Sequence, residues 1–160
     1  MKSSHIPAFY DPGMSLDQEK WQGYTQTPAK PKLMMEYLER KNLMEYFRIK
    51  DDWPPFDRED FYIAHTREMV DNFFDRGKTS RILNMQWSPE YAESVRYENA
   101  SLYYAIRHAV LHPDEVCFSP SAAFHHANPT RGALFCAFSG QVKSRCRFQF
   151  GCNYFKLDRL

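Results

Sequence analysis

The sequence has little excess charge of either sign and no long apolar stretch. Its 160 residues include 21 Lys and Arg against 20 Asp and Glu, a formal net charge of +1. A balance this close to neutral argues against a strongly basic nucleic-acid-binding protein and against an acidic tail protein. No run approaches the length of about 18 apolar residues that a membrane-spanning helix needs. We therefore expect neither nucleic acid nor membrane as a partner.

The sequence also has no closely paired cysteines, and we expect no leader segment. The chain has four cysteines, Cys117, Cys136, Cys146 and Cys152, and none forms a Cys-x-x-Cys pair, which argues against a zinc finger. The first residues contain no apolar run of the kind found in secretory signals. The sequence therefore predicts a cytoplasmic protein with free thiols.

The composition that is present is globular and rich in aromatic rings. Hydrophobic residues make up 43%, charged residues 26% and aromatic residues 16%, enough to build a buried core in one domain. Residues 143–160 differ from the rest, because they hold five basic residues against Asp158 alone and two of the four cysteines. We therefore expect a partial domain over 1–142 and a divergent basic tail over 143–160.

Caps, turns and apolar spacing predict an alternation of helices and strands. Amphipathic spacing and capping residues predict helices over about 32–47, from a cap at Asp57 to about 64, over about 67–77, and from a cap at Ser88 to Leu111. Strands are expected over 6–10 and over 115–119, the second of them buried and central because it is apolar between turn signals. A helix that feeds a buried strand favours an α/β sheet, whose sites lie beyond the carboxyl ends of its strands. Residues 120–133 stand at that position.

Two adjacent histidines, His125 and His126, lie in this segment. Imidazole exchanges protons near neutral pH, so a pair of histidines can divide the base and acid roles of a reaction. Adjacent residues point in different directions, so each ring could address a different atom of one substrate. The alternative is that both are loop histidines in ordinary hydrogen bonds, and the spacing alone leaves both interpretations open.

The wider string is similar to a known superfamily. Residues 119–127 (SPSAAFHHA) followed by 131–140 (RGALFCAFSG) resemble the histone deacetylase and acetylpolyamine amidohydrolase superfamily, which has a His-His-Ala triplet and a Phe-Cys segment at this distance. Upstream, 63–66 (IAHT) and 97–102 (YENASL) resemble its His-containing segment and its small-residue helix. The resemblance covers about residues 5–142.

The resemblance implies both a fold and a chemistry. The fold would be α/β, the N-terminal portion of an arginase–deacetylase-type domain with a mainly parallel sheet flanked by helices. The activity would be zinc-dependent hydrolysis of acetyl-amides on lysine or polyamine. By this likeness His125 and His126 match the pair that handles protons around a zinc-bound water, Phe135 matches an aromatic lining the substrate tunnel, and Cys136 matches a residue behind it. Without the resemblance, core packing is the simpler interpretation of Phe135 and Cys136.

The chain departs from this pattern where the family binds zinc. Leu134 replaces a glycine, Ser139 replaces an asparagine, and alanines replace the glycines of the turn before the His pair. The family's Asp-x-His zinc ligands have no counterpart, and the only later acid is Asp158. We therefore expect no metal ligands in this chain, no zinc bound by the chain alone, and no activity in isolation.

Three explanations remain open for such a chain. It is an inactive truncated or frame-shifted deacetylase, a non-catalytic remnant or binding subunit, or one half of a split deacetylase completed by a second chain. An incomplete sheet also predicts self-association or a second chain as partner. The other histidines, His5, His65, His108 and His112, are expected to be ordinary. His108 and His112 have metal-ligand spacing on a helix but no third ligand nearby in the sequence.

Overall fold

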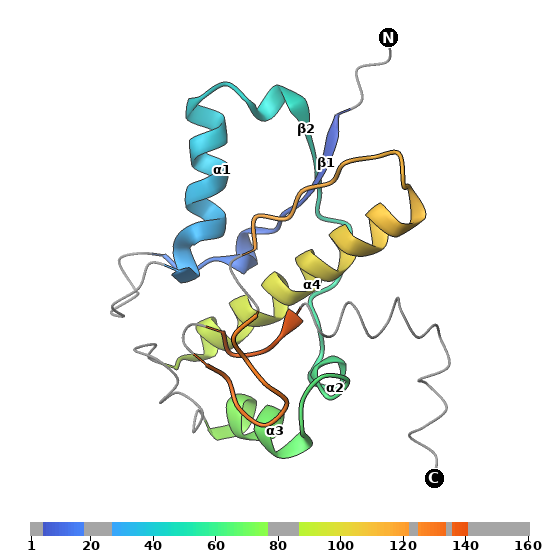
Figure 1. The fold of residues 1–160 in the computed structure, drawn as a ribbon. Coiled ribbons are helices and arrows are strands. Elements are labelled where there is room, and N and C mark those ends of the chain that lie inside the picture. Colours follow the sequence, from blue (N-terminus) through green and yellow to red (C-terminus); the bar gives the residue numbers. More distant parts are fainter. Residues whose placement is uncertain (1–4, 18–26, 77–86, 122–124, 134–135, 141–160) are drawn as a thin grey trace.

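The computed structural model describes residues 5–17, 27–76, 87–121, 125–133 and 136–140 (Figure 1). The predicted tail over 143–160, its boundary near residue 142, and the positions of Phe135 and Leu134 lie outside these residues. The division of the chain into a partial domain and a tail therefore stays a prediction.

The strands form a small parallel sheet. Strand β1 (Ile6–Phe9) pairs in parallel with β2 (Phe47–Lys50), with Ile6 opposite Phe47. On the other side of β1, Ala8 and Phe118 form a single parallel bridge. The Phe118 N–H donates to the Pro7 carbonyl at 2.9 Å, and the Phe9 N–H donates to the Phe118 carbonyl at 2.8 Å. Among the described residues β1 is therefore the middle strand.

The prediction of a buried central strand over 115–119 is wrong, because this segment forms only the one bridge to β1 and Val116 is 74% exposed. Two prolines explain why the ladder does not extend. The next hydrogen bonds in a parallel register would come from the N–H groups of Pro7 and Pro120, and proline has none. The Phe9 carbonyl, which Pro120 cannot reach with a hydrogen bond, accepts from the Ser101 hydroxyl instead.

The expected helix over 32–47 is also partly wrong. Helix α1 (Lys30–Arg40) ends where Asn42 takes a left-handed conformation, with φ of 54°. A short 3-10 turn (Met44–Tyr46) follows, and then β2 begins. The last apolar residues of the helical pattern therefore lie in a turn and a strand rather than in the helix.

The remaining helices begin where the sequence predicts. Helix α2 (Arg58–Phe61) follows Asp57, whose N–H donates to the Asp60 carboxylate at 3.0 Å, and it is shorter than expected. Helix α3 is Arg67–Arg76. Helix α4 (Pro89–Leu111) begins with the Ser88 hydroxyl accepting from the Tyr91 N–H at 3.1 Å. No helix in the described ranges combines the length and apolarity needed to cross a membrane.

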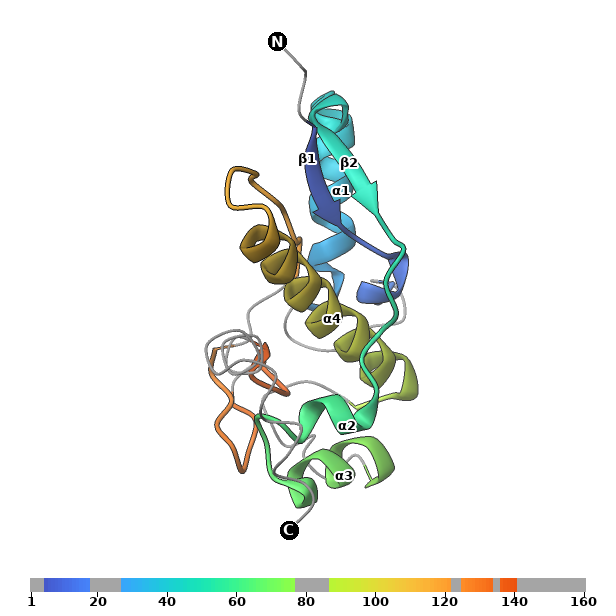
Figure 2. The same cartoon turned by 90° about the vertical axis from the view of Figure 1, so that its right-hand side faces the viewer.

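The helices lie on two sides of the strands. In Figures 1 and 2, α1 and the C-terminal half of α4 lie on opposite sides of the β1–β2 pair. The N-terminal half of α4 lies near α2, α3 and the segment 136–140. The core there is largely aromatic, and its most buried rings are Phe56, Phe61, Phe73 and Phe138.

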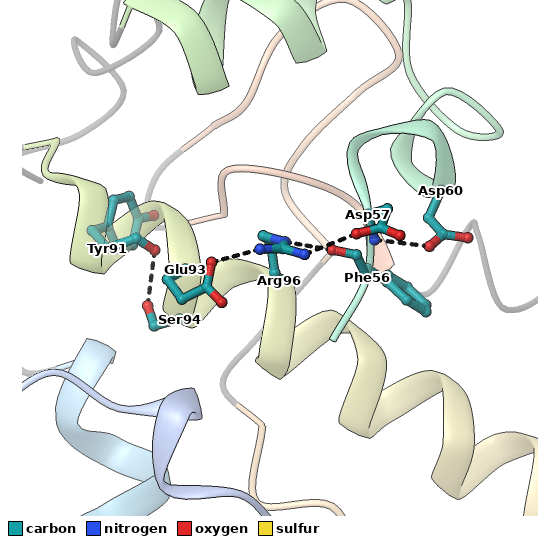
Figure 3. A network of polar contacts seen from close by, with 7 residues as sticks. All are labelled: Phe56, Asp57, Asp60, Tyr91, Glu93, Ser94 and Arg96. Atoms are coloured by element: carbon teal, nitrogen blue, oxygen red, sulfur yellow. Dashed lines mark hydrogen bonds and ion pairs between the residues drawn. The ribbon is translucent and has the colours of Figure 1, made fainter. Parts of the chain in front are cut away.

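Arg96 joins this part of α4 to the segment before α2 (Figure 3). Its Nε donates to the Phe56 carbonyl at 2.6 Å, one Nη contacts Asp57 at 2.9 Å, and the other contacts Glu93 at 2.7 Å. These contacts hold the start of α2 against α4, and so position the aromatic core on which the candidate site rests.

Candidate active site

The loop that carries the histidine pair starts from a chain of hydroxyl groups. Ser101, fully buried on α4, has its Oγ 2.7 Å from Ser119 Oγ, and Ser119 Oγ lies 2.9 Å from Ser121 Oγ. Ser101 also donates to the carbonyl of Phe9 in β1. The start of the loop is thereby tied to the sheet and to the long helix. It directly follows the bridge residue Phe118, where the sequence predicted a site.

The two predicted histidines lie against each other. Their ring centroids are 3.9 Å apart at an interplanar angle of 45°. His125 is exposed and His126 is half-buried. The expectation that adjacent side chains would point in different directions therefore does not hold at this pair. Both imidazoles face one region, where one ring can accept a proton while the other donates one.

Cys136, the residue expected behind a tunnel, lies beneath the backbone of this pair. It is fully buried, and burial raises the pKa of its thiol above the ordinary value. The nearby backbone of His126 and His125 acts in the opposite direction. A buried thiol whose pKa is raised is a poor nucleophile. Phe135, its predicted neighbour in a tunnel wall, lies outside the described residues.

A buried carboxyl group also lies near the thiol. Glu98 on α4 is buried, and its negative charge raises the pKa of both Cys136 and Tyr91, although burial is the larger cause in each case. Sequence reasoning assigned no role to Glu98. The available signal was its position seven residues after Tyr91 on the apolar stripe of the helix, where a charged residue is unexpected.

His65 is the second residue whose role the sequence missed. It is 5% exposed, and its ring lies 5.2 Å from that of Phe138. Its Nδ1 lies 3.0 Å from the Asn128 carbonyl oxygen, and its Nε2 accepts from the Ser139 N–H at 2.8 Å. The only signal in the sequence was its place in the short segment that resembles the family's His-containing segment.

The histidines at the end of α4 form a separate cluster. His108 and His112 have ring centroids 4.4 Å apart, and His108 Nε2 lies 3.0 Å from Glu115 Oε2. The hydrogen bond from His108 holds the pKa of Glu115 below its ordinary value. These contacts tie the helix end to the following segment.

The described residues do not offer the ligands of a catalytic zinc. Such an ion takes about three protein ligands and keeps one position for water. Within the described ranges, no three His, Cys, Asp or Glu side chains are grouped so as to hold a metal ion. The donor set described here therefore does not fit the zinc that the resemblance implies.

The comparisons with known proteins concern the fold. Neither a protein-family model nor a curated protein matches the sequence. A crystal structure of the HDA15 HD domain, a histone deacetylase domain, matches with a TM-score of 0.62 and 16% identity. The match covers 89% of this chain and 42% of that chain, so this chain spans less than half of the solved domain. The predicted α/β fold, with a small parallel sheet and flanking helices, is therefore confirmed as a fold of the histone deacetylase type.

Proposed function

We propose that this chain belongs to the histone deacetylase superfamily and carries the proton-handling histidines of a site that hydrolyses acetyl-amides on lysine or polyamine. The observation that carries the proposal is the fold likeness over 89% of the chain. It is supported by a pair of adjacent histidines in ring contact, within a string whose sequence resembles that of the superfamily. The localisation that accompanies this proposal is cytoplasmic.

The chemistry of the chain's own residues is proton transfer. Hydrolysis of an amide needs a base that takes a proton from water and an acid that gives one to the leaving amine. His125 and His126 provide two such groups in ring contact, one open to solvent and one half-buried. The buried Cys136 thiol lies close to the backbone of both residues. The ring contact keeps the two imidazoles side by side.

We also propose that the chain alone is inactive, because its described residues do not group the ligands of a catalytic zinc. Two versions of this proposal differ in class. In a split deacetylase, a second chain supplies the zinc ligands and the His pair remains catalytic. In a non-catalytic binding subunit, the acetylated amine binds near the pair and is not hydrolysed.

The segment around the 118 bridge is the place where a second chain or a second copy would add. Residues 116–121 contain no charged side chain, although natural sheet edges are usually protected by charge. In the described part of the chain, this segment pairs with β1 on one side through a single bridge. Light scattering of the 160-residue chain should show self-association. A monodisperse monomer that melts cooperatively both with and without residues 143–160 would contradict the incomplete-sheet proposal.

The activity test uses the purified full chain with an acetyl-lysine peptide and an acetylated polyamine. We expect less than stoichiometric zinc after dialysis and no turnover, with or without added zinc. About one tightly bound zinc per chain, measured by elemental analysis, would contradict the proposal that this chain lacks the ligands.

If a partner chain restores hydrolysis, His126→Ala should lower it by about 10²–10⁴-fold, the usual contribution of acid–base catalysis. His108→Ala, at the far end of α4, is the matched control and should leave the rate unchanged. A restored enzyme that tolerates alanine at both His125 and His126 would remove the catalytic role of the pair. Substrate binding without hydrolysis under every condition would favour the binding subunit.

A further inference from the structure

We propose that His65 is a positioning residue for the histidine pair, acting as a neutral ring with its proton on Nδ1. It connects the loop that carries His125 and His126 to the segment that carries Cys136. The importance of this connection for chemistry rests on the proposed function. The connection itself is a property of the fold and can be tested without any activity.

The two nitrogens of His65 make different hydrogen bonds. The Asn128 carbonyl is an acceptor only, so Nδ1, 3.0 Å away, must donate to it. The Ser139 N–H is a donor only, so Nε2 must accept from it, at 2.8 Å. One neutral tautomer satisfies both contacts. A proton on Nε2 would place two donors against each other in a buried site.

The partners of His65 lie close in sequence to the residues of the candidate site. Asn128 is two residues after His126, and Ser139 is three residues after Cys136. His65 itself is 63 and 74 residues away from these two partners. The ring is therefore a long-range link between the His-pair loop and the Cys136 segment.

Neighbouring contacts make this link rigid. The next residue, Thr66, donates its N–H to the Pro129 carbonyl at 2.8 Å, so two successive residues hold the same turn. Within that turn, the Asn128 N–H donates to the Arg131 carbonyl at 2.9 Å, and the Asn128 side chain accepts from the Arg131 N–H at 2.9 Å. The carbonyl that His65 contacts is therefore fixed by its own turn.

The turn that follows the His pair is the point at which His65 holds the loop. Asn128, the first residue of that turn, bonds to Nδ1 of His65. Ser139, three residues after Cys136, bonds to Nε2 of the same imidazole, so His65 ties the loop to one short segment. Loss of His65 should release the loop from that segment at this point.

The test compares three variants of the full chain by NMR. His65→Phe keeps an aromatic ring beside Phe138 and removes both hydrogen bonds. His65→Gln keeps one donor and one acceptor on a side chain of similar reach. His108→Phe is the matched control, because it makes the same substitution at a histidine that contacts Glu115 rather than the loop.

In the unsubstituted chain, long-range nitrogen–proton spectra should show the His65 proton on Nδ1 and a bare Nε2. In His65→Phe, the ring-proton signals of His125 and His126 should shift. Their backbone amides should exchange about tenfold faster, the change expected from losing one hydrogen bond of ordinary strength. His65→Gln should restore part of the protection, and His108→Phe should leave these signals as they were.

Three results would overturn the proposal. The first is a His65 proton on Nε2 in the unsubstituted chain. The second is a folded His65→Phe chain whose His125 and His126 signals and exchange rates are unchanged. The third, which decides the matter if His65→Phe does not fold, is a His65→Gln chain with no more change at the pair than His108→Phe. A partner-restored enzyme that tolerates alanine at both His125 and His126, in a chain whose His65 contacts are intact, would instead count against the proposed function alone.

Discussion

Phe138 is the residue whose truncation should damage the fold most clearly. Its side chain is fully buried, and its ring lies 4.5 Å from that of Phe61, 4.9 Å from that of Phe73 and 5.2 Å from that of His65. It therefore joins α2 and α3 to the segment that carries Cys136. Phe138→Ala would leave a cavity lined by these rings, and the rigid aromatic neighbours limit how far the site can collapse.

The expected cost follows from the size of the side chain and its complete burial. Truncating a buried phenylalanine to alanine costs about 3–5 kcal/mol. The net stability of a domain is only about 5–15 kcal/mol, so the variant should lose a large share of it. At about 2–4 °C per kcal/mol for a chain of this size, the melting temperature should fall by roughly 6–20 °C.

Urea unfolding followed by circular dichroism and by tyrosine and tryptophan fluorescence measures this loss. Tyr46→Ala is the matched control, because that ring is 56% exposed in the turn before β2 and its loss should cost less than about 0.5 kcal/mol. Equal losses for the two variants, or a loss below about 1 kcal/mol for Phe138→Ala, would refute the assignment of Phe138 to a closely packed core.

Three further predictions concern charge and ionisation. Arg96→Met removes the charged donor to the Phe56 carbonyl and should lower the free energy of unfolding by about 1–3 kcal/mol. Asp57→Asn weakens only the exposed ion pair with Arg96 and should cost less than about 1 kcal/mol. The hydrogen bond from His108 lowers the pKa of Glu115 in the folded chain, so the ionised carboxylate stabilises the fold above its unfolded pKa. This contribution disappears as pH falls. Glu115→Gln should therefore flatten the acid side of a curve of unfolding free energy against pH. Burial raises the pKa of Tyr91, so the folded chain retains the phenol proton after the unfolded chain has lost it. The free energy of unfolding should therefore fall as pH rises above about 10. Tyr91→Phe should reduce this alkaline loss of stability in urea unfolding.

Local signals in the sequence determined where most helices begin. The Ser88 cap with Pro89 predicted the start of α4, and Asp57 predicted the start of α2, because capping depends on side chains within one turn of the backbone they bond. The first strand was also predicted correctly. The string around His125 and His126 led to the deacetylase type of fold, which the structural comparison confirms. The roles assigned to these histidines and to Cys136 stay predictions.

Tertiary structure decided which segments pair and which polar residues are buried. Phe47 continued a helical pattern in sequence but lies in β2, because pairing with β1 outweighs local periodicity. Pro7 and Pro120 each look like ordinary strand or turn residues. Only the pairing of Ala8 with Phe118, which places one proline on each side of the bridge, shows why that bridge stays single. The sequence predicted no role for His65, since its partners Asn128 and Ser139 lie more than sixty residues away. Contacts of that range depend on the folded arrangement of the whole core, and no local pattern of residue types encodes them.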